Sequence, residues 1–128
     1  MINYYWFSVF VAANALLLLV LATNVSLMRL KYKISYGDGD NKDLFRAIRV
    51  HANGIEQVPI FALLLLGLSF SSVSSIFMAG LVVAFTCARI SHACGMLFSI
   101  HQARRAGAGF TYLLQAVAVV ALLIYVNG

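Results

Sequence analysis

Four long apolar segments constrain the fold of this chain more than any other feature of its sequence. They cover about residues 4–28, 44–70, 73–100 and 110–126. Each approaches or exceeds the roughly 20 apolar residues that a helix needs to cross a bilayer. A membrane-spanning β-barrel would alternate apolar and polar residues, and these segments are continuously apolar instead. The sequence therefore predicts an all-α integral membrane protein, a bundle of four transmembrane helices.

The composition supports the same interpretation. Of the 128 residues, 62% are hydrophobic and 10% are charged, whereas about 25% of the residues in a soluble domain are charged. So few charges cannot solvate a globule of this size, and lipid is the expected solvent. The four segments use most of the chain, so we expect one membrane domain over residues 1–128 with no separate soluble domain.

Positive charges are distributed unevenly among the connections between the segments. The connection near residues 69–75 has no charge, whereas Arg104 and Arg105 lie in the third connection. The positive-inside rule therefore predicts that the first and third connections are cytoplasmic and that both termini are periplasmic, as in a bacterial inner membrane protein. The net charge of +5 reflects this asymmetry. It suits contact with anionic lipid head groups and does not indicate nucleic acid. The basic residues at the first connection are Arg29, Lys31, Lys33, Lys42 and Arg46.

Polar residues of the second segment gather on one face of the expected helix. At about 100° per residue, they fall within a stripe of roughly 100°. A charge at the middle of a spanning helix costs about 2.5–3.5 kcal/mol, so we expect the stripe to face protein or a wet cavity. The third segment has a sparser stripe of Arg89, His92 and Ser99. The excess positive charge of the two stripes favours an anionic ligand. The stripe of the second segment consists of Arg46, Arg49, Asn53, Glu56 and Gln57.

A purely structural role for these residues is an open alternative. Arg49, Glu56 and Arg89 could form buried salt bridges that fix the helix register, and Arg46 could extend its charge to the membrane interface. Buried ion pairs seldom stabilise more than apolar packing does, and ionisable groups inside a membrane are often functional. A binding site is therefore the favoured interpretation. No cluster of Cys, His and carboxylate residues has the spacing of a metal site, so no metal is expected.

The second segment resembles a known family signature. Arg49, Asn53, Glu56 and Pro59 match the second-helix pattern of the MAPEG family, the membrane-associated proteins in eicosanoid and glutathione metabolism. The loop over residues 32–39 is similar to that of small bacterial members. Three further stretches are similar in order and spacing: residues 28–31 to the basic end of the first helix, 88–95 to the third-helix motif, and 104–105 to the basic loop that follows it.

The resemblance implies a homotrimer of four-helix subunits, with glutathione bound between neighbours near the cytoplasmic side. Arginines would bind the two glutathione carboxylates and a glutamate would bind the ammonium group. The resemblance also implies an activating arginine for the thiol, Arg105 with Arg104 as the alternate. A nearby guanidinium lowers the pKa of a thiol from about 8.5 and so favours the reactive thiolate. The residues that the resemblance assigns to glutathione are Arg29, Arg49, Asn53, Glu56, Arg89 and His92.

The implied function is that of a microsomal glutathione transferase-like enzyme, which conjugates or reduces hydrophobic electrophiles with glutathione. One residue departs from the pattern, because Met96 stands where some members have a tyrosine. The arginines, with Ser99 or Tyr112, remain as substitutes for that hydroxyl. One alternative is a non-catalytic protein of the same fold that binds glutathione or lipid. Another is a small multidrug transporter, but those rely on a glutamate in the first helix, where this chain has no acidic residue.

Overall fold

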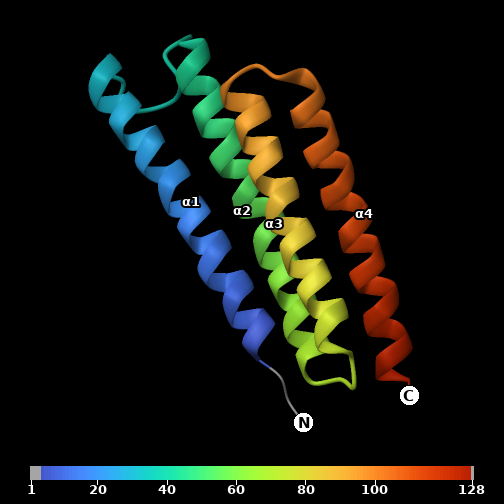
Figure 1. Cartoon of the computed structure of the whole chain (residues 1–128). Helices are drawn as coiled ribbons and strands as arrows, with labels where there is room; N and C mark the ends of the chain where they lie inside the picture. The colour runs from blue at the N-terminus through green and yellow to red at the C-terminus, as the bar shows by residue number, and fades with distance from the viewer. Residues whose placement is uncertain (1–3, 128) are drawn as a thin grey trace.

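The computed structural model describes residues 4–127, which form a bundle of α-helices in the order α1 to α4. The helices run alternately up and down, so the start of α1 and the end of α4 lie at one end of the bundle (Figure 1). Each helix is long and apolar enough to cross a membrane, which confirms the predicted four-helix bundle. The bounds are Tyr5–Tyr32 for α1, Lys42–Ser69 for α2, Ser75–Leu97 for α3 and His101–Val126 for α4.

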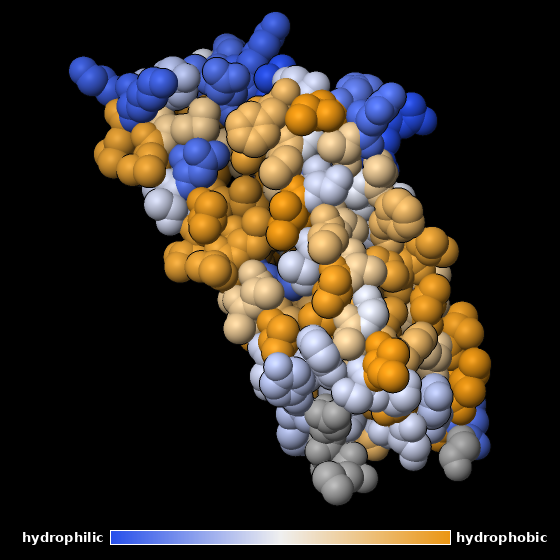
Figure 2. Space-filling view, viewed as in Figure 1, coloured by the Kyte–Doolittle hydropathy of each residue, from blue (hydrophilic) through white to orange (hydrophobic). Residues whose placement is uncertain are grey.

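The two central helices are α2 and α3, and α1 and α4 flank them. Helix α3 packs most extensively against α4, and α1 packs against α2 and α3. Within residues 4–127, α1 and α4 make no contact with each other. The connections α1–α2 and α3–α4 lie at the end of the bundle opposite the termini (Figure 1). We call this end the charged end, because the hydrophilic surface residues gather there (Figure 2).

Three phenylalanines join α1, α2 and α3 in the half of the bundle nearer the termini. Phe10, Phe61 and Phe85 are fully buried. The rings of Phe61 and Phe85 stack with their centroids 3.9 Å apart, and the ring of Phe10 lies 5.4 and 5.5 Å from them. Buried aromatic pairs of this kind contribute about 0.5–1.5 kcal/mol beyond the burial of their area. Apolar packing therefore holds this half together.

The helix boundaries follow from local hydrogen bonds. The side chain of Asn41 accepts a hydrogen bond from the backbone N–H of Leu44 at 2.9 Å, and it caps the start of α2. Ser74 caps α3 in the same way. Helix α1 extends beyond the predicted residue 28 to Tyr32, and it ends at Lys33, which has a φ of 55°. Helix α2 continues through Pro59 as one helix.

The predicted start of the fourth helix near residue 110 is wrong. Helix α4 begins at His101, so Gly107 and Gly109 lie within it and do not form a turn. Arg104 and Arg105 accordingly belong to the first turns of α4, and the connection from α3 consists of residues 98–100. The apolar pattern starts at Phe110, but the small and basic residues before it also form helix.

Two glycines explain why α3 and α4 pack so closely. A Cβ atom on Gly95 would collide with the backbone N of Arg104. A Cβ atom on Gly107 would lie 2.6 Å from the backbone O of Ala88 and 2.8 Å from Cα of His92. Only glycine permits two helix backbones to approach this closely. The approach brings the first turns of α4 beside the last turns of α3.

Candidate functional site

A cleft near the charged end collects polar side chains from three helices. Its volume is about 310 Å³. Both candidates for thiol activation, Arg104 and Arg105, line it, and no carboxylate of the described residues does. We call it the Arg49 cleft. Its lining residues are Arg49 and Asn53 from α2, His92 and Met96 from α3, and Arg104, Arg105 and Ala108 from α4.

Arg89 lies behind this cleft and does not line it. Its side chain is 3% exposed. Nη2 donates to Oδ1 of Asn53 at 2.6 Å, and Nη1 donates to Oγ1 of Thr111 at 3.4 Å. The hydroxyl of Thr111 in turn donates to the backbone O of Gly107 at 2.7 Å. A buried guanidinium is tolerated only when its donors are paired. Arg89 thus joins α2, α3 and α4, and it fixes Asn53 at the wall of the cleft.

The tautomer of His92 follows from its contact with Arg89. Nη2 of Arg89 lies 3.4 Å from Nδ1 of His92. A guanidinium can only donate, so Nδ1 must be the acceptor. In a neutral imidazole the proton then resides on Nε2, which leaves that N–H as a donor. The oxygen of Asn53 is likewise occupied by Arg89, so its NH2 group is its remaining donor. Both side chains therefore suit an anionic ligand.

Arg104 has contacts but no negatively charged partner. Its Nη1 lies 4.0 Å from Sδ of Met96, and its Nη2 lies 3.5 Å from Nε2 of His101. Arg105 is exposed and lines the same cleft. Neither arginine belongs to α3, because that helix ends at Leu97. Both arginines reach the cleft through the start of α4.

Other predicted site residues lie outside the Arg49 cleft. Arg29 donates through Nη1 to the backbone O of Gly37 at 2.8 Å and to that of Ile34 at 3.3 Å, and so it holds the α1–α2 connection. Glu56 lies one turn beyond Asn53 on α2 with its side chain exposed. Neither Arg29 nor Glu56 lines the cleft.

The alternative of buried salt bridges can be compared directly with the structure. Among residues 4–127, the one ion pair joins Arg46 to Asp43 at 3.9 Å, and both side chains are substantially exposed. Arg49, Glu56 and Arg89 therefore have no oppositely charged partner within the described subunit. The polar residues of the α2 stripe therefore do not share one set of partners. The last of them, Gln57, accepts a hydrogen bond from Nε2 of Gln115 on α4 at 2.6 Å.

Of the expected substitutes for a tyrosine hydroxyl, the arginines line the cleft, but Ser99 and Tyr112 do not. Ser99 follows the end of α3 in a left-handed conformation with a φ of 58°. Tyr112 is exposed on α4. Neither lines the Arg49 cleft, whereas Met96 does. The prediction that Ser99 shares a helical face with Arg89 and His92 is wrong, because the helix ends before it.

Thr111 and Gln115 are polar partners that the sequence reasoning missed. Both lie in the fourth apolar segment, four residues apart, and each contacts a polar residue of another helix. Polar residues within a spanning helix usually face protein. The four-residue spacing of Thr111 and Gln115 puts them on one face of α4, and this pattern in the sequence could have identified both.

Comparison with known proteins now decides the family. The model of the MAPEG family matches residues 7–124. This chain belongs to the MAPEG family. It is 28% identical over 118 residues to inner membrane protein YecN of Escherichia coli strain K12, across 92% of this chain and 90% of the relative. The protein of the same name from Escherichia coli O6:H1 gives the same figures. All residues of the Arg49 cleft lie within the matched span.

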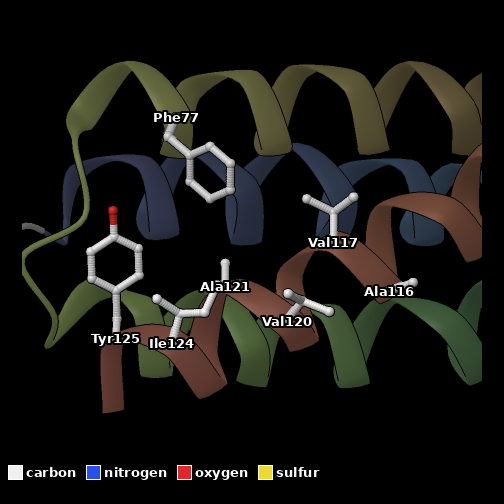
Figure 3. Close-up of a pocket in the computed structure, with 7 residues that line it drawn as sticks. All are labelled: Phe77, Ala116, Val117, Val120, Ala121, Ile124 and Tyr125. Atoms are coloured by element: carbon white, nitrogen blue, oxygen red, sulfur yellow. The ribbon is translucent and has the colours of Figure 1, made fainter. Parts of the chain in front are cut away.

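Another hollow of this MAPEG protein lies away from the polar residues. It is an apolar groove of about 510 Å³, formed by Phe77 of α3 and one side of α4 between Ala116 and Tyr125 (Figure 3). Along α4, Ala116 is about 12 Å from Ala108, at 1.5 Å per residue. The groove therefore belongs to the apolar surface of the half nearer the termini.

Proposed function

We propose that this membrane protein binds glutathione in the Arg49 cleft and uses its thiolate to conjugate or reduce hydrophobic electrophiles. One observation carries the proposal: Arg49, Arg104 and Arg105 converge on a single cleft without a carboxylate. Glutathione has two carboxylates, which arginines can bind bidentately. Membership of the MAPEG family supports this choice of anion.

Activation of the thiol is the chemical step that the cleft must perform. A thiol with a pKa near 8.5 is only a few per cent ionised at pH 7. A guanidinium beside the sulfur stabilises the negative charge and lowers the thiol pKa. Arg105 is our first candidate for this role and Arg104 is the alternate. The thiol proton passes to solvent, and in conjugation the thiolate sulfur forms a bond to the electrophilic carbon of a substrate that reaches the cleft from the membrane. The leaving group departs with the electron pair of the bond that breaks.

The proposed assembly is a homotrimer, with glutathione bound between subunits. Glu56 is exposed near the middle of α2, and a charge at such a depth costs about 2.5–3.5 kcal/mol if it faces lipid. A neighbouring subunit would remove this cost by covering Glu56. In this arrangement Glu56 binds the ammonium group of glutathione, and Arg29 contributes across the interface. Detergent-corrected mass measurement should give a trimer, and a monomer that still binds glutathione would contradict the shared site.

The proposed location is a bacterial inner membrane, with the charged end in the cytoplasm. The relative is named as an inner membrane protein. Most basic residues lie in or beside the α1–α2 and α3–α4 connections. The hydrophilic surface gathers at the same end (Figures 1 and 2). The positive-inside rule places this end in the cytoplasm, where glutathione would have access to the cleft.

A binding test can separate glutathione recognition from a structural role of the same residues. A ligand that binds only the native state stabilises it by about 2.7 kcal/mol at one hundred times Kd. Saturating glutathione should therefore raise the Tm of the purified protein. Arg49→Gln should abolish most of this rise, and Glu56→Gln should weaken it. Lys33→Gln is the matched control, because Lys33 is an exposed cation outside the cleft. Equal responses of the wild type and Arg49→Gln would refute the assigned site.

A second candidate function is binding without turnover. Met96 lines the cleft, and its thioether cannot donate a hydrogen bond to a thiolate. The two functions differ in one measurement, the conjugation of glutathione to a standard aromatic electrophile. Turnover that disappears in Arg49→Gln supports the enzyme. Binding of glutathione without turnover supports the non-catalytic alternative.

A further inference from the structure

A second basic cleft lies beside the Arg49 cleft at the charged end of the bundle. Its volume is about 390 Å³. We call it the Lys42 cleft. The first turns of both α2 and α4 contribute to it, so residues far apart in the sequence form one basic surface. No carboxylate of the described residues lines it. The lining residues are Lys42, Phe45, Arg46, Gly95, Met96, Ser99, His101 and Arg104.

The positive charges of this cleft are poorly compensated within the protein. The side chain of Lys42 makes no hydrogen bond or ion pair with the described residues. Asp38 and Asp40 line a neighbouring hollow with Lys42, but neither forms an ion pair with it. Arg46 has only the 3.9 Å contact with Asp43, and the two side chains are 41% and 64% exposed. Exposed pairs of this kind are weak and screened by salt. The guanidinium of Arg104 contacts Met96 and His101, and neither of these side chains is an anion. The cleft thus holds three cations that are available to an external anion.

The walls of the cleft are mixed in character. Phe45 and Met96 provide apolar surface beside the cations, and Ser99 provides a hydroxyl. The cleft lies at the charged end, because the first turns of α2 and α4 and the end of α3 form it. A ligand that fits must therefore combine a compact anion with an apolar stem. A soluble anion would leave the apolar wall unused.

We propose that the Lys42 cleft binds the phosphate of an anionic phospholipid head group. Basic pockets between transmembrane helices at the cytoplasmic side recognise such head groups. The phosphate lies among Lys42, Arg46 and Arg104, and an acyl chain descends from it along Phe45. This site is distinct from the Arg49 cleft, because it includes neither Arg49 nor Asn53. It also does not require that glutathione binds.

The two clefts are nevertheless connected, because Arg104 and Met96 line both. A head group that engages Arg104 withdraws its guanidinium from the Arg49 cleft. If the proposed function holds, anionic lipid regulates the glutathione site through Arg104, and thiol activation then rests on Arg105. Lipid binding itself is measured without glutathione, so the two proposals can fail separately.

The experiment measures retained lipid on the full-length protein. The protein is equilibrated with mixed micelles of equal parts phosphatidylglycerol and phosphatidylcholine, and the lipid that remains bound is identified by native mass spectrometry. The wild type should retain phosphatidylglycerol selectively. Each basic residue near an anionic surface gives roughly a fivefold gain in binding. The double variant Lys42→Gln, Arg46→Gln should therefore bind phosphatidylglycerol at least about tenfold more weakly.

The matched control is the double variant Lys31→Gln, Lys33→Gln. It removes the same charge from the same end of the bundle, and neither residue lines the Lys42 cleft. Phosphatidylglycerol binding should be unchanged in the control. If both double variants lost phosphatidylglycerol binding equally, the binding would be nonspecific electrostatic attraction, and the proposal would be overturned. Displacement by inorganic phosphate alone, with no preference for phosphatidylglycerol, would assign the cleft to a soluble anion and overturn the lipid assignment. Circular dichroism of each variant confirms that it is folded.

Discussion

The two ends of the bundle hold their helices together in different ways. At the end near the termini, the contacts between helices are largely apolar, with the stacked rings of Phe61 and Phe85 at their centre. Two side-chain hydrogen bonds join α1 to α3 there, from Nε1 of Trp6 to Oγ of Ser75 and from Nδ2 of Asn14 to Oγ1 of Thr86. At the charged end, Arg89 joins three helices through polar contacts, and Gly95 and Gly107 bring two backbones together.

This difference indicates where function resides. Apolar contacts between helices stabilise any helical bundle in lipid, whatever ligand it binds. They therefore do not indicate which ligand this protein binds. Polar groups at the charged end exceed what packing requires, since Arg49, Arg104 and Arg105 have no anionic partner in the described subunit. Unpaired cations beside the hydrogen-bonded Arg89 support the proposed anion site. The following predictions test this contrast between the two ends.

The largest expected effect concerns the side of the membrane that each end faces. The charge asymmetry predicts a cytoplasmic charged end and periplasmic termini. A reporter that is active only in the cytoplasm should be silent when fused after Gly128 and active when inserted at Gly37 in the α1–α2 connection. Cytoplasmic activity of the fusion after Gly128 would invert the bundle and remove the access of the Arg49 cleft to cytoplasmic glutathione.

The next effect concerns the close approach of α3 and α4. Gly107→Ala places a Cβ atom against the backbone of Ala88 and His92, so the helices must separate. We expect a loss of about 2–3 kcal/mol in the free energy of unfolding, the upper range for overpacking. Gly109→Ala is the control, because no atom lies within 4 Å of its Cβ position. It should be neutral or stabilise by up to about 1 kcal/mol through helix propensity. Unfolding in mixed detergent, followed by circular dichroism, measures both, and similar stabilities would show that the approach is not tight.

A smaller effect distinguishes the two polar contacts of α2. Asn53→Ala removes the acceptor of the buried guanidinium of Arg89 and should cost about 2 kcal/mol of stability, the range for hydrogen bonds to charged groups. Gln57→Ala removes a neutral contact with Gln115 and should cost about 1 kcal/mol. The same unfolding assay ranks the two variants. The reverse order would mean that Arg89 does not depend on Asn53 for its burial.

The smallest effect concerns the bound thiol. A positive charge near sulfur favours the thiolate, so removing that charge raises the thiol pKa. Arg105→Ala should raise the apparent pKa of bound glutathione by roughly one pH unit, or about 1.4 kcal/mol. Ultraviolet absorbance of the thiolate across a pH titration gives this value, and Arg104→Ala tests the alternate. If the apparent thiol pKa were unchanged in both variants, these arginines would serve only to anchor the protein at the membrane face.

The sequence predicts the spans well because apolarity over about 20 residues has one main physical explanation. It predicts the start of α4 poorly, because Gly107 resembles a turn residue until its contact with His92 is known. The stripe of α2 places Asn53 and Glu56 on one face, but only Asn53 lines the cleft. Which residues of the stripe reach the cleft depends on how α2 is rotated about its axis relative to α3 and α4. The sequence of α2 alone does not determine that rotation. The link from Arg89 to Thr111 depends on the same rotation.

The short α3–α4 connection also has a consequence for the order of assembly. Residues 98–100 close a loop between two helices whose backbones touch, and a loop this short costs little entropy to close. Such local contacts favour rapid formation, so the α3–α4 hairpin should form before the rest of the bundle. Among the described helices, α1 meets only α2 and α3, and a longer connection joins it to α2, so it should dock late. Its backbone amides should therefore exchange with deuterium sooner than those of α3, because the element that docks last is the one that opens first.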